Sequence, residues 1–390
     1  MENLQATFTK LLRETSTDFL RYMFSKIDWD ARMIGITGPR GVGKTTMVLQ
    51  YAKLHLPRKQ TLYVNAEDFY FSSHRLFDLA ETFAKSGGKY LLIDEIHKYS
   101  GWAHELKLIY DYHSELKVVF TGSSVLDINK GAHDLSRRAL MYHMQGLSYR
   151  EYLQLFHKIE LPTLSLQQIL ANEIPDVDGF LPLEHFADYL NRGYYPFMTK
   201  SSIAQYVGQV VNNTLEVDIP QYADLTASMA RKVKRLLGII AQSAPFKPNM
   251  TQIGAQLEMS RNNIADICVY LEKAGMIGML RNSTGGIQGL GKLEKIYLDN
   301  CTLMNVIAGE QPEIGTIREV FFFNQLRVSH KVESSPISDF LVDGKFTFEV
   351  GGKKKKQKQL QGIADGFVVK DDIEVGYGNI VPLWVFGLTY

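Results

Sequence analysis

The stretch at residues 33–46 constrains the fold more than any other part of the sequence. It reads Met-Ile-Gly-Ile-Thr-Gly-Pro-Arg-Gly-Val-Gly-Lys-Thr-Thr, a short apolar run followed by a glycine-rich loop. The loop fits the pattern G-x-x-x-x-G-K-[ST], in which glycines let backbone N–H groups turn inward around phosphate oxygens. The apolar run before the loop and the helical pattern after it predict a strand, a phosphate-binding loop and a helix start.

Each residue type in this loop has a role in holding a nucleotide. Inward-facing amides and the N-terminus of the following helix bind an anion. Lys44 is expected to reach the β- and γ-phosphates, and the Thr45 hydroxyl to complete the coordination of Mg²⁺. The predicted cofactors are therefore ATP or ADP and Mg²⁺. The predicted nucleotide-binding residues are Gly38, Pro39, Arg40, Gly41, Val42, Gly43, Lys44, Thr45 and Thr46.

Apolar runs alternate with helical patterns over the first 150 residues. Such alternation predicts a parallel sheet covered by helices, the α/β class. A helix over residues 6–25 is also expected to lie against this core. The predicted strands are 33–37, 61–65, 90–94, 117–121 and 139–144, and the helical patterns between them include 76–83 and 102–113.

Two adjacent carboxylates, Asp94 and Glu95, end the apolar run at residues 90–94. Asp94 is expected to hold Mg²⁺ through water, and Glu95 to orient and activate the attacking water. The alternative is an acidic loop without a chemical role. At the end of the next strand, Thr121 or Ser123 could sense the γ-phosphate, although a turn capped by serine explains the same residues.

Two arginines, Arg137 and Arg138, stand just before the fifth predicted strand. They could complete the active site of a neighbouring subunit as an arginine finger, or they could simply be solvated. Ser148 and Glu151 then form an S-x-x-E capping box, which predicts the start of a helix. We expect the domain that contains the phosphate loop to extend to about residue 155.

Bulk properties exclude several classes of protein. The chain has 390 residues, an apolar content of 45% and a formal charge of +1, which predicts two to four domains and no wholesale polybasic character. Its two cysteines, Cys268 and Cys301, predict neither a zinc cluster nor a disulfide framework, which fits a reducing cytoplasm. No secretory leader or long apolar segment is readable, so we expect a cytoplasmic protein without a membrane partner.

The middle of the chain changes pattern twice. Residues 156–222 look helical and predict a helical lid, whereas residues 223–300 give three helical patterns and a Gly-rich hairpin, the order of a winged helix. A winged helix could bind DNA or serve only as a packing or oligomer module. The basic residues that could contact DNA are Arg231, Lys232, Lys234, Arg235, Arg281, Lys292 and Lys295.

The last block, residues 301–390, carries acidic residues on neighbouring elements. Asp339 and Glu349 are expected at one strand edge, with Glu319 on a preceding helix, where the three could gather a divalent metal. A surface hairpin with a basic turn is the alternative. The lysine run from Lys353 to Lys356 could add a DNA-binding surface.

Six stretches together carry a resemblance to a known family. The chain resembles prokaryotic AAA-type P-loop ATPases, near the STAND branch, that end in a restriction-endonuclease-like domain of unknown function. The stretches are 38–46 (GPRGVGKTT), 93–98 (IDEIHK), 120–124 (FTGSS), 135–138 (LSRR), 146–152 (GLSYREY) and 348–353 (FEVGGK).

The resemblance implies a sheet of order 5-1-4-3-2 with a catalytic glutamate, a helical lid, a winged helix and a terminal PD-(D/E)XK-like α/β domain. By resemblance, Asn65 restrains the catalytic glutamate, and the segment ending at Pro196 touches adenine. Active nucleases of this fold usually place a lysine two residues after the glutamate, whereas position 351 is glycine. Lys353 would lie about 6–7 Å further along the strand, so we expect weak cleavage or none.

These observations predict a Mg²⁺-dependent ATPase that uses hydrolysis to rearrange its appended winged-helix and nuclease-like domains, in a homo-oligomer. Two alternatives of other classes remain at this point. One is a slow-turnover, ATP-dependent binding switch on DNA or a protein partner. The other is an ATP-regulated DNA nuclease.

Overall fold

The computed structural model of the chain forms two compact units, residues 1–146 and residues 147–390. It describes all residues except 123–134, 136, 176–178, 198–201, 221–225, 244–248, 283–292, 309–311, 356–359 and 361. Ser123 and Lys292, both predicted to have a role, therefore lie outside the described residues, as does Lys356.

The first unit is built on a five-stranded parallel sheet. Its order is β2-β3-β4-β1-β5, which reads 5-1-4-3-2 from the other edge, as the resemblance implies. The strands are β1 (Met33–Thr37), β2 (Thr61–Asn65), β3 (Tyr90–Asp94), β4 (Lys117–Thr121) and β5 (Leu140–His143). The helices are α1 (Glu2–Glu14), α2 (Lys44–His55), α3 (Leu76–Lys85) and α4 (Trp102–Tyr112), and the short turns are η1 (Tyr22–Ser25), η2 (Arg58–Gln60), η3 (Phe69–Ser72) and η4 (Ile96–Lys98).

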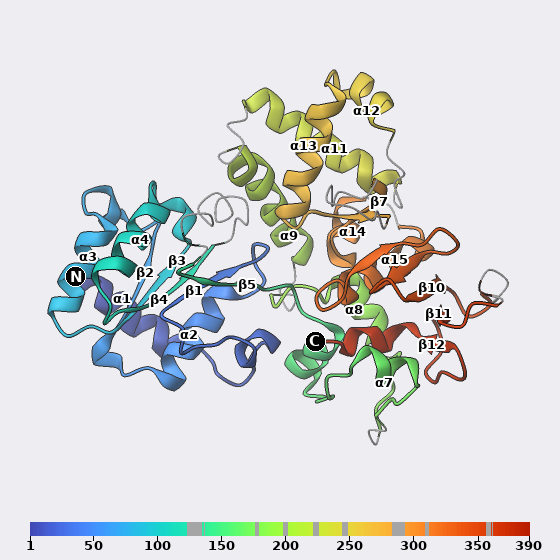
Figure 1. Cartoon of the computed structure of the whole chain (residues 1–390), viewed down its shortest axis with the longest axis horizontal. Helices are drawn as coiled ribbons and strands as arrows, with labels where there is room; N and C mark the ends of the chain where they lie inside the picture. The colour runs from blue at the N-terminus through green and yellow to red at the C-terminus, as the bar shows by residue number, and fades with distance from the viewer. Residues whose placement is uncertain are drawn as a thin grey trace. The chain divides into compact units, whose positions relative to one another are not determined.

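Helices cover both faces of this sheet (Figure 1). The chain passes from the inner strand β1 to β2 at the edge, and then returns through β3 to the central strand β4. Because parallel crossovers are right-handed, this reversal of direction places α2 on one face and α3 and α4 on the other. All five strands run in the same direction, so their carboxyl ends, and the loops that follow them, meet at one edge.

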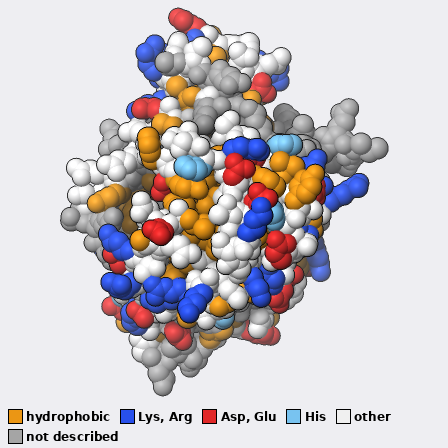
Figure 2. Space-filling model, turned by 90° about the vertical axis from the view of Figure 1, so that its left-hand side faces the viewer, with side chains coloured by type: hydrophobic (Ala, Val, Ile, Leu, Met, Phe, Trp, Pro, Cys, Tyr) orange, Lys and Arg blue, Asp and Glu red, His pale blue; other side chains and the backbone are white. Residues whose placement is uncertain are grey.

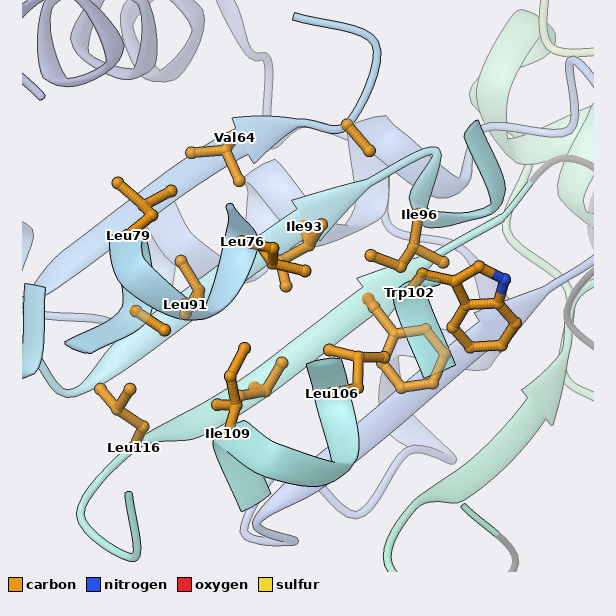
Figure 3. Packing of buried hydrophobic residues seen from close by; sticks show 14 of the residues in the cluster. Val64, Leu76, Leu79, Leu91, Ile93, Ile96, Trp102, Leu106, Ile109 and Leu116 are labelled. Atoms are coloured by element: carbon orange, nitrogen blue, oxygen red, sulfur yellow. The ribbon is translucent and has the colours of Figure 1, made fainter. Parts of the chain in front are cut away.

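The main hydrophobic core of the first unit lies between the sheet and the pair α3 and α4 (Figure 3). Alternate strand residues point into it, because successive side chains of a strand face opposite sides. Ile93, Leu106 and Phe120 are fully or almost fully buried in this cluster. The core thus fixes the strands whose ends carry the predicted chemistry.

The N-terminal segment departs from the prediction of a helix over residues 6–25. Helix α1 ends at Glu14, and Thr15 is already extended, with φ −75° and ψ 118°. The Ser16 hydroxyl then bonds the Asp18 side chain at 2.9 Å and accepts from the Asp18 amide at 3.1 Å. Such local side-chain bonds compete with the helix, so the segment turns and ends in η1.

The second unit combines helices with two sheets. Three helices, α11, α12 and α13, precede an antiparallel hairpin of β6 and β7, in the order predicted for residues 223–300. The helical elements are α6 (Tyr149–Tyr152), η5 (Leu153–His157), α7 (Leu166–Leu170), α8 (Phe186–Arg192), α9 (Ile203–Asn213), η6 (Thr214–Asp218), α11 (Ala227–Ser243), α12 (Met250–Leu257), α13 (Arg261–Lys273), α14 (Cys301–Ile307), α15 (Ile314–Leu326) and η8 (Leu383–Leu388).

A mixed five-stranded sheet of order β12-β11-β10-β9-β8 completes the second unit. Strands β10, β11 and β12 are parallel, whereas β8, β9 and β10 are antiparallel. Phe322 of α15 contacts the rings of Phe340, Phe348 and Phe386, which anchors the helix on the sheet. The strands of this unit are β6 (Ile277–Arg281), β7 (Leu293–Leu298), β8 (Val332–Ser334), β9 (Phe340–Val342), β10 (Phe346–Gly351), β11 (Gly366–Lys370) and β12 (Ile380–Pro382).

The boundary between the units falls earlier than residue 155. The predicted capping box at Ser148 and Glu151 is present and begins α6. However, the Ser148 hydroxyl donates to the Tyr390 carbonyl at 2.8 Å, and Arg150 Nε donates to the same oxygen at 3.0 Å. Residues 147–155 therefore pack with the end of the chain and belong to the second unit.

Within the described residues, no helix is long and apolar enough to cross a membrane.

Figure 2 looks onto the side that carries α1 and α3, where hydrophobic side chains gather near the centre and Lys and Arg side chains surround them.

Candidate functional site

The loop between β1 and α2 has the backbone shape that its glycines predict. Gly38, Gly41 and Gly43 have φ angles of 147°, 84° and 100°, a region that L side chains rarely adopt. A Cβ at Gly38 would lie 2.1 Å from the Met144 carbonyl oxygen. Glycine is therefore required at Gly38 both for the turn and for the close approach of the chain after β5.

Lys44, the first residue of α2, is buried within its own loop. Its ammonium donates to the carbonyl oxygens of Gly38 and Pro39, both at 2.8 Å. These bonds close the loop around the lysine. In them, the backbone carbonyls of Gly38 and Pro39 point inward, toward the Lys44 ammonium. The loop thus holds a positive charge at the N-terminus of α2, where the helix dipole also favours anions.

Asp94, at the end of β3, gathers three hydroxyl groups from three other elements. Its Oδ2 accepts from Thr45 Oγ1 at 2.8 Å and from the Tyr63 hydroxyl at 2.9 Å, and its Oδ1 accepts from Thr121 Oγ1. All three partners are hydroxyl groups, so none of these contacts brings a cation to Asp94. Thr45 and Asp94, the two predicted Mg²⁺ ligands, therefore lie together.

Glu95 adopts a strained backbone conformation next to this cluster. Its φ of 51° and ψ of 39° are left-handed, which costs a non-glycine residue about 1–3 kcal/mol and is found most often at functional positions. Its amide donates to Thr121 Oγ1 at 3.3 Å, and its carboxylate lies 3.4 Å from Nε2 of the buried His97. Glu95 thus contacts His97, whereas Asp94 contacts Thr45, Tyr63 and Thr121, so the two carboxylates have different surroundings.

The residues predicted to assist Glu95 lie in different places. The Asn65 side chain accepts from the Glu67 amide at 2.8 Å, a local hydrogen bond that closes a turn after β2. Thr121 does contact the site through Asp94, which fits a sensing position. The hydrogen bond from Thr121 also links the carboxyl ends of β3 and β4.

Arg137 and Arg138 lie at the start of β5, the opposite end of the sheet from the phosphate loop. Arg138 is paired with Asp111 of α4 through bonds of 2.9 and 3.0 Å, which hold the pKa of that carboxyl below its usual range. Arg137 is exposed. Neither arginine can reach the phosphate loop of its own chain, so a finger role requires a neighbour.

Pro196 belongs to the second unit, and its predicted contact with adenine stays a prediction.

The acidic residues of the C-terminal block converge as predicted. The register of β9 and β10 brings Asp339 opposite Glu349, and the Asp339 carboxylate accepts from the Val350 amide at 2.9 Å. Glu319 of α15 accepts from Lys295 at 3.0 Å and from the Tyr297 hydroxyl at 2.5 Å. The Lys295 ammonium also lies 3.7 Å from Asp339, so it bridges two of the three carboxylates.

The lysine at this cluster is Lys355, not Lys353. Strand β10 ends at Gly351, the chain turns at residues 353–354, and the Lys355 ammonium returns to within 2.5 Å of Glu349 Oε1. Burial, followed by the nearby charges of Glu319 and Glu349, raises the pKa of Asp339. Among the described residues, no group of three or more His, Cys, Asp or Glu is arranged to hold a metal. Lys295 and Lys355 lie against the three predicted ligands, and the metal site at Glu319, Asp339 and Glu349 stays a prediction.

The basic residues predicted to contact DNA differ in how strongly they are engaged. Arg281 is held by Glu272 at 2.7 Å, and Lys234 by Glu216 at 3.0 Å. Arg231 and Arg235 are exposed on α11. Of the predicted surface, these two arginines are the best placed to meet a phosphate backbone.

Sequence reasoning missed three contributors to these clusters. From the sequence, Tyr63 was indistinguishable from other strand residues, and Lys295 was predicted to lie in a DNA-binding wing. Lys355 was hidden within a lysine run. Strand alternation gave no signal for Tyr63, because its ring packs against Phe8 while only its hydroxyl reaches Asp94.

Comparisons with known proteins agree with this geometry. Residues 30–153 match the family described as an AAA domain, and residues 183–313 match a domain of unknown function, DUF8612. The second match runs across the predicted domain boundaries at residues 222 and 300. An uncharacterized protein from Methanocaldococcus jannaschii is 24% identical over 265 residues, which cover 63% of this chain and 56% of the relative. The chain thus spans little more than half the length of that relative.

Two solved structures are similar at low sequence identity. A Walker-type ATPase from Pyrococcus abyssi has a TM-score of 0.42 and 12% identity, covering 78% of this chain and 95% of that one. The AMPPCP-bound DnaA from Aquifex aeolicus has a TM-score of 0.25 and 12% identity, covering 69% and 88%. Residues 30–153 are thus similar to an AAA domain, and the matched range includes the loop at residues 38–46 and the carboxylates of Asp94 and Glu95.

Proposed function

We propose that the protein binds ATP with Mg²⁺, hydrolyses it, and uses this cycle to change the arrangement of its second unit. One observation carries the proposal: Thr45 Oγ1 of the phosphate loop lies 2.8 Å from Asp94 Oδ2, beside the buried ammonium of Lys44. This geometry brings the anion-binding helix end and the charged carboxylate together at one sheet edge. It is the arrangement that a triphosphate with a divalent cation requires.

The residues present fit both ATP and Mg²⁺. The glycine loop supplies backbone amides, Lys44 supplies a mobile charge, and Thr45 and Asp94 supply oxygen ligands of the kind that Mg²⁺ prefers. Mg²⁺, when bound, would supply positive charge that offsets the charge of the phosphates. Lys44 exchanges its bonds with the Gly38 and Pro39 carbonyls for phosphate oxygens. Glu95, which follows Asp94 in a left-handed conformation, orients the attacking water and accepts its proton.

Two variants separate binding from turnover. Lys44→Ala should abolish tight ATP binding, whereas Glu95→Gln should keep binding and lower turnover by roughly 10²–10⁴-fold, the usual contribution of a general base. Glu67→Gln is a matched control, because Glu67 is an exposed acid at the same sheet edge. Fluorescent ATP binding and phosphate release measure the two steps. Equal loss of binding in Lys44→Ala and Glu95→Gln would contradict the division of roles.

Assembly into a homo-oligomer is part of the proposal, because the finger arginines cannot serve their own site. Arg137 is the stronger candidate, since Arg138 is engaged by Asp111. An arginine supplied by a neighbour can raise the rate by about 10³–10⁵-fold. The rate per molecule should then rise with protein concentration and lose this dependence in Arg137→Ala. A concentration-independent rate in a strictly monomeric sample would count against the finger.

For the second unit, we propose a winged helix formed by α11, α12, α13 and the β6–β7 hairpin, with weak electrostatic DNA binding through Arg231 and Arg235. Both arginines are exposed on α11, and phosphate contacts make affinity fall steeply with salt. Replacing both by glutamine should reduce the salt dependence together with the affinity. Salt-insensitive binding, or unchanged binding in the double variant, would refute the assignment.

For the C-terminal sheet, we propose the nuclease-like fold without efficient cleavage. The sequence-based reason, a displaced lysine, is kept in a modified form: the lysine that reaches Glu349 is Lys355, which comes from the turn after β10 and not from the strand position two residues after the glutamate. Plasmid and single-stranded DNA should therefore survive incubation in Mg²⁺ or Mn²⁺. Cleavage that disappears in both Asp339→Ala and Glu349→Ala would overturn this proposal and support an ATP-regulated nuclease.

A further inference from the structure

One buried guanidinium outside all of the nucleotide-binding motifs contacts the phosphate loop. Arg21, just before η1, is 5% exposed. It donates to the carbonyl oxygen of Val42 in the phosphate loop, and to those of Gln145 and Gly146, the latter two at 2.8 Å. Gln145 and Gly146 are the last residues of the first unit. A single side chain thus joins the phosphate loop to the segment from which the second unit begins.

The start of the phosphate loop is tied to the same segment by its backbone. The Met144 amide donates to the Thr37 carbonyl at 2.8 Å, and the Met144 carbonyl lies where a Cβ of Gly38 would be. The first residues of the loop therefore cannot shift without moving the chain after β5. Arg21 makes the corresponding link for the second half of the loop, through Val42.

We infer that Arg21 is a positioning residue that holds the phosphate loop in its binding shape and transmits the loop's response to ATP to residues 143–147. This inference rests on the proposed ATP binding. Guanidinium suits the task because it is planar, always charged, and carries five donors in a fixed fork. A lysine at this position keeps the charge but has one nitrogen, so it cannot span Val42 and the 145–146 carbonyls together. Arg21 belongs to none of the sequence motifs. Its partners are backbone atoms far away in the chain, so the sequence carried no signal for its role.

Hydrogen exchange of the full-length chain tests the inference in the Glu95→Gln background, which is expected to bind ATP without turnover. Addition of Mg²⁺ and ATP should slow exchange both in the loop at residues 38–46 and in the peptide at residues 143–147. In Arg21→Lys, saturating ATP should still protect the loop, whereas the response at residues 143–147 should fall to the part that the Met144–Thr37 backbone bond carries. The ATP dissociation constant should rise about tenfold, a loss of the size expected for a weakened set of charge-assisted hydrogen bonds. Arg13→Lys makes the same chemical change at an exposed site and should behave like the parent.

The possible outcomes separate the two proposals. If ATP protects neither segment in the parent protein, ATP binding itself is refuted. If the loop is protected and residues 143–147 do not respond in the parent, the coupling is refuted while ATP binding stands, and this result requires no Arg21 variant to fold. If Arg21→Lys and the parent respond equally at residues 143–147 with equal affinity, Arg21 is not the link. A folded Arg21→Lys protein that keeps loop protection but responds less than the parent at residues 143–147 supports the inference.

Discussion

The hydroxyl of Tyr63 should stabilise the first unit by a measurable amount through Asp94 alone. Burial, followed by the charge of Asp94, raises the pKa of Tyr63, so its hydroxyl remains a donor at any working pH. Tyr63→Phe keeps the ring packed against Phe8 and removes one of three hydroxyl donors from a buried carboxylate. A hydrogen bond to a charged group contributes about 1.5–3 kcal/mol, compared with about 0.5–1.5 kcal/mol for a neutral pair. The cost of Tyr63→Phe should therefore fall by about 1–1.5 kcal/mol in the Asp94→Asn background.

The tryptophans of the chain allow the first unit to be measured by itself. Trp29 and Trp102 belong to the first unit and Trp384 to the second, so fluorescence in a Trp384→Phe background reports only the unfolding of the first. Denaturant titrations of the four proteins of the cycle then give the coupling free energy. Tyr90→Phe, at the opposite end of β3, is the control. Equal losses in the two backgrounds would show that the Tyr63 hydroxyl does not act through the carboxylate of Asp94.

Three further predictions concern the core, the loop and the acidic cluster. Leu106→Ala should lower the unfolding free energy of the first unit by about 2–5 kcal/mol in the same fluorescence assay, because Leu106 is fully buried. Gly38→Ala should weaken ATP binding far more than Gly101→Ala, since both glycines have positive φ but only Gly38 faces a clash; equal binding in the two variants would contradict the steric argument. Asp339 has a raised pKa in the native state, which therefore binds the extra proton, so stability falls as pH rises from about 3.9 through the raised value. The melting temperature of Asp339→Asn should accordingly improve relative to the parent between pH 4 and pH 7, and a constant difference would refute the assignment.

The sequence predicted the sheet of the first unit well because four of its five strands, β1 to β4, are buried along most of their length. A strand covered by helices on each side must be apolar throughout, so the runs at residues 33–37 and 117–121 stand out from their polar flanks. The loop glycines are equally legible, since their φ angles exclude other residues. The phosphate loop and the carboxylates at the end of β3 could therefore be placed together before any coordinates were known.

The N-terminal segment shows where such reasoning ends. Apolar residues at helical spacing continue from α1 to η1, but the helix stops at Glu14 because Ser16 and Asp18 offer the backbone another set of bonds. Arg21 follows in the irregular segment, and its acceptors are carbonyl oxygens more than 20 residues away. Spacing rules describe neighbours within one element, so they carry no information about a side chain that joins three backbone segments.

The lysine of the C-terminal cluster was misplaced for a related reason. Alternation along a strand places residues 349, 351 and 353 on one face, and this argument holds only while the strand continues. Strand β10 ends at Gly351, and a turn brings back Lys355 instead. The successive glycines Gly351 and Gly352 indicated that the strand could end there. They did not indicate which of the following lysines would contact Glu349.

The two acidic clusters of the chain lead to opposite expectations, although both gather carboxylates at strand ends. Asp94 is surrounded by the hydroxyls of Thr45, Tyr63 and Thr121, which orient its oxygens without cancelling its charge. A divalent cation arriving there gains the full attraction of the carboxylate. In the C-terminal cluster, Lys295 and Lys355 pair with Glu319 and Glu349, so an arriving cation would meet two ammonium groups and a smaller net negative charge. The identity of the neighbours, as well as the number of acids, therefore sets how strongly each cluster would attract a cation, and this comparison favours Asp94 as a ligand.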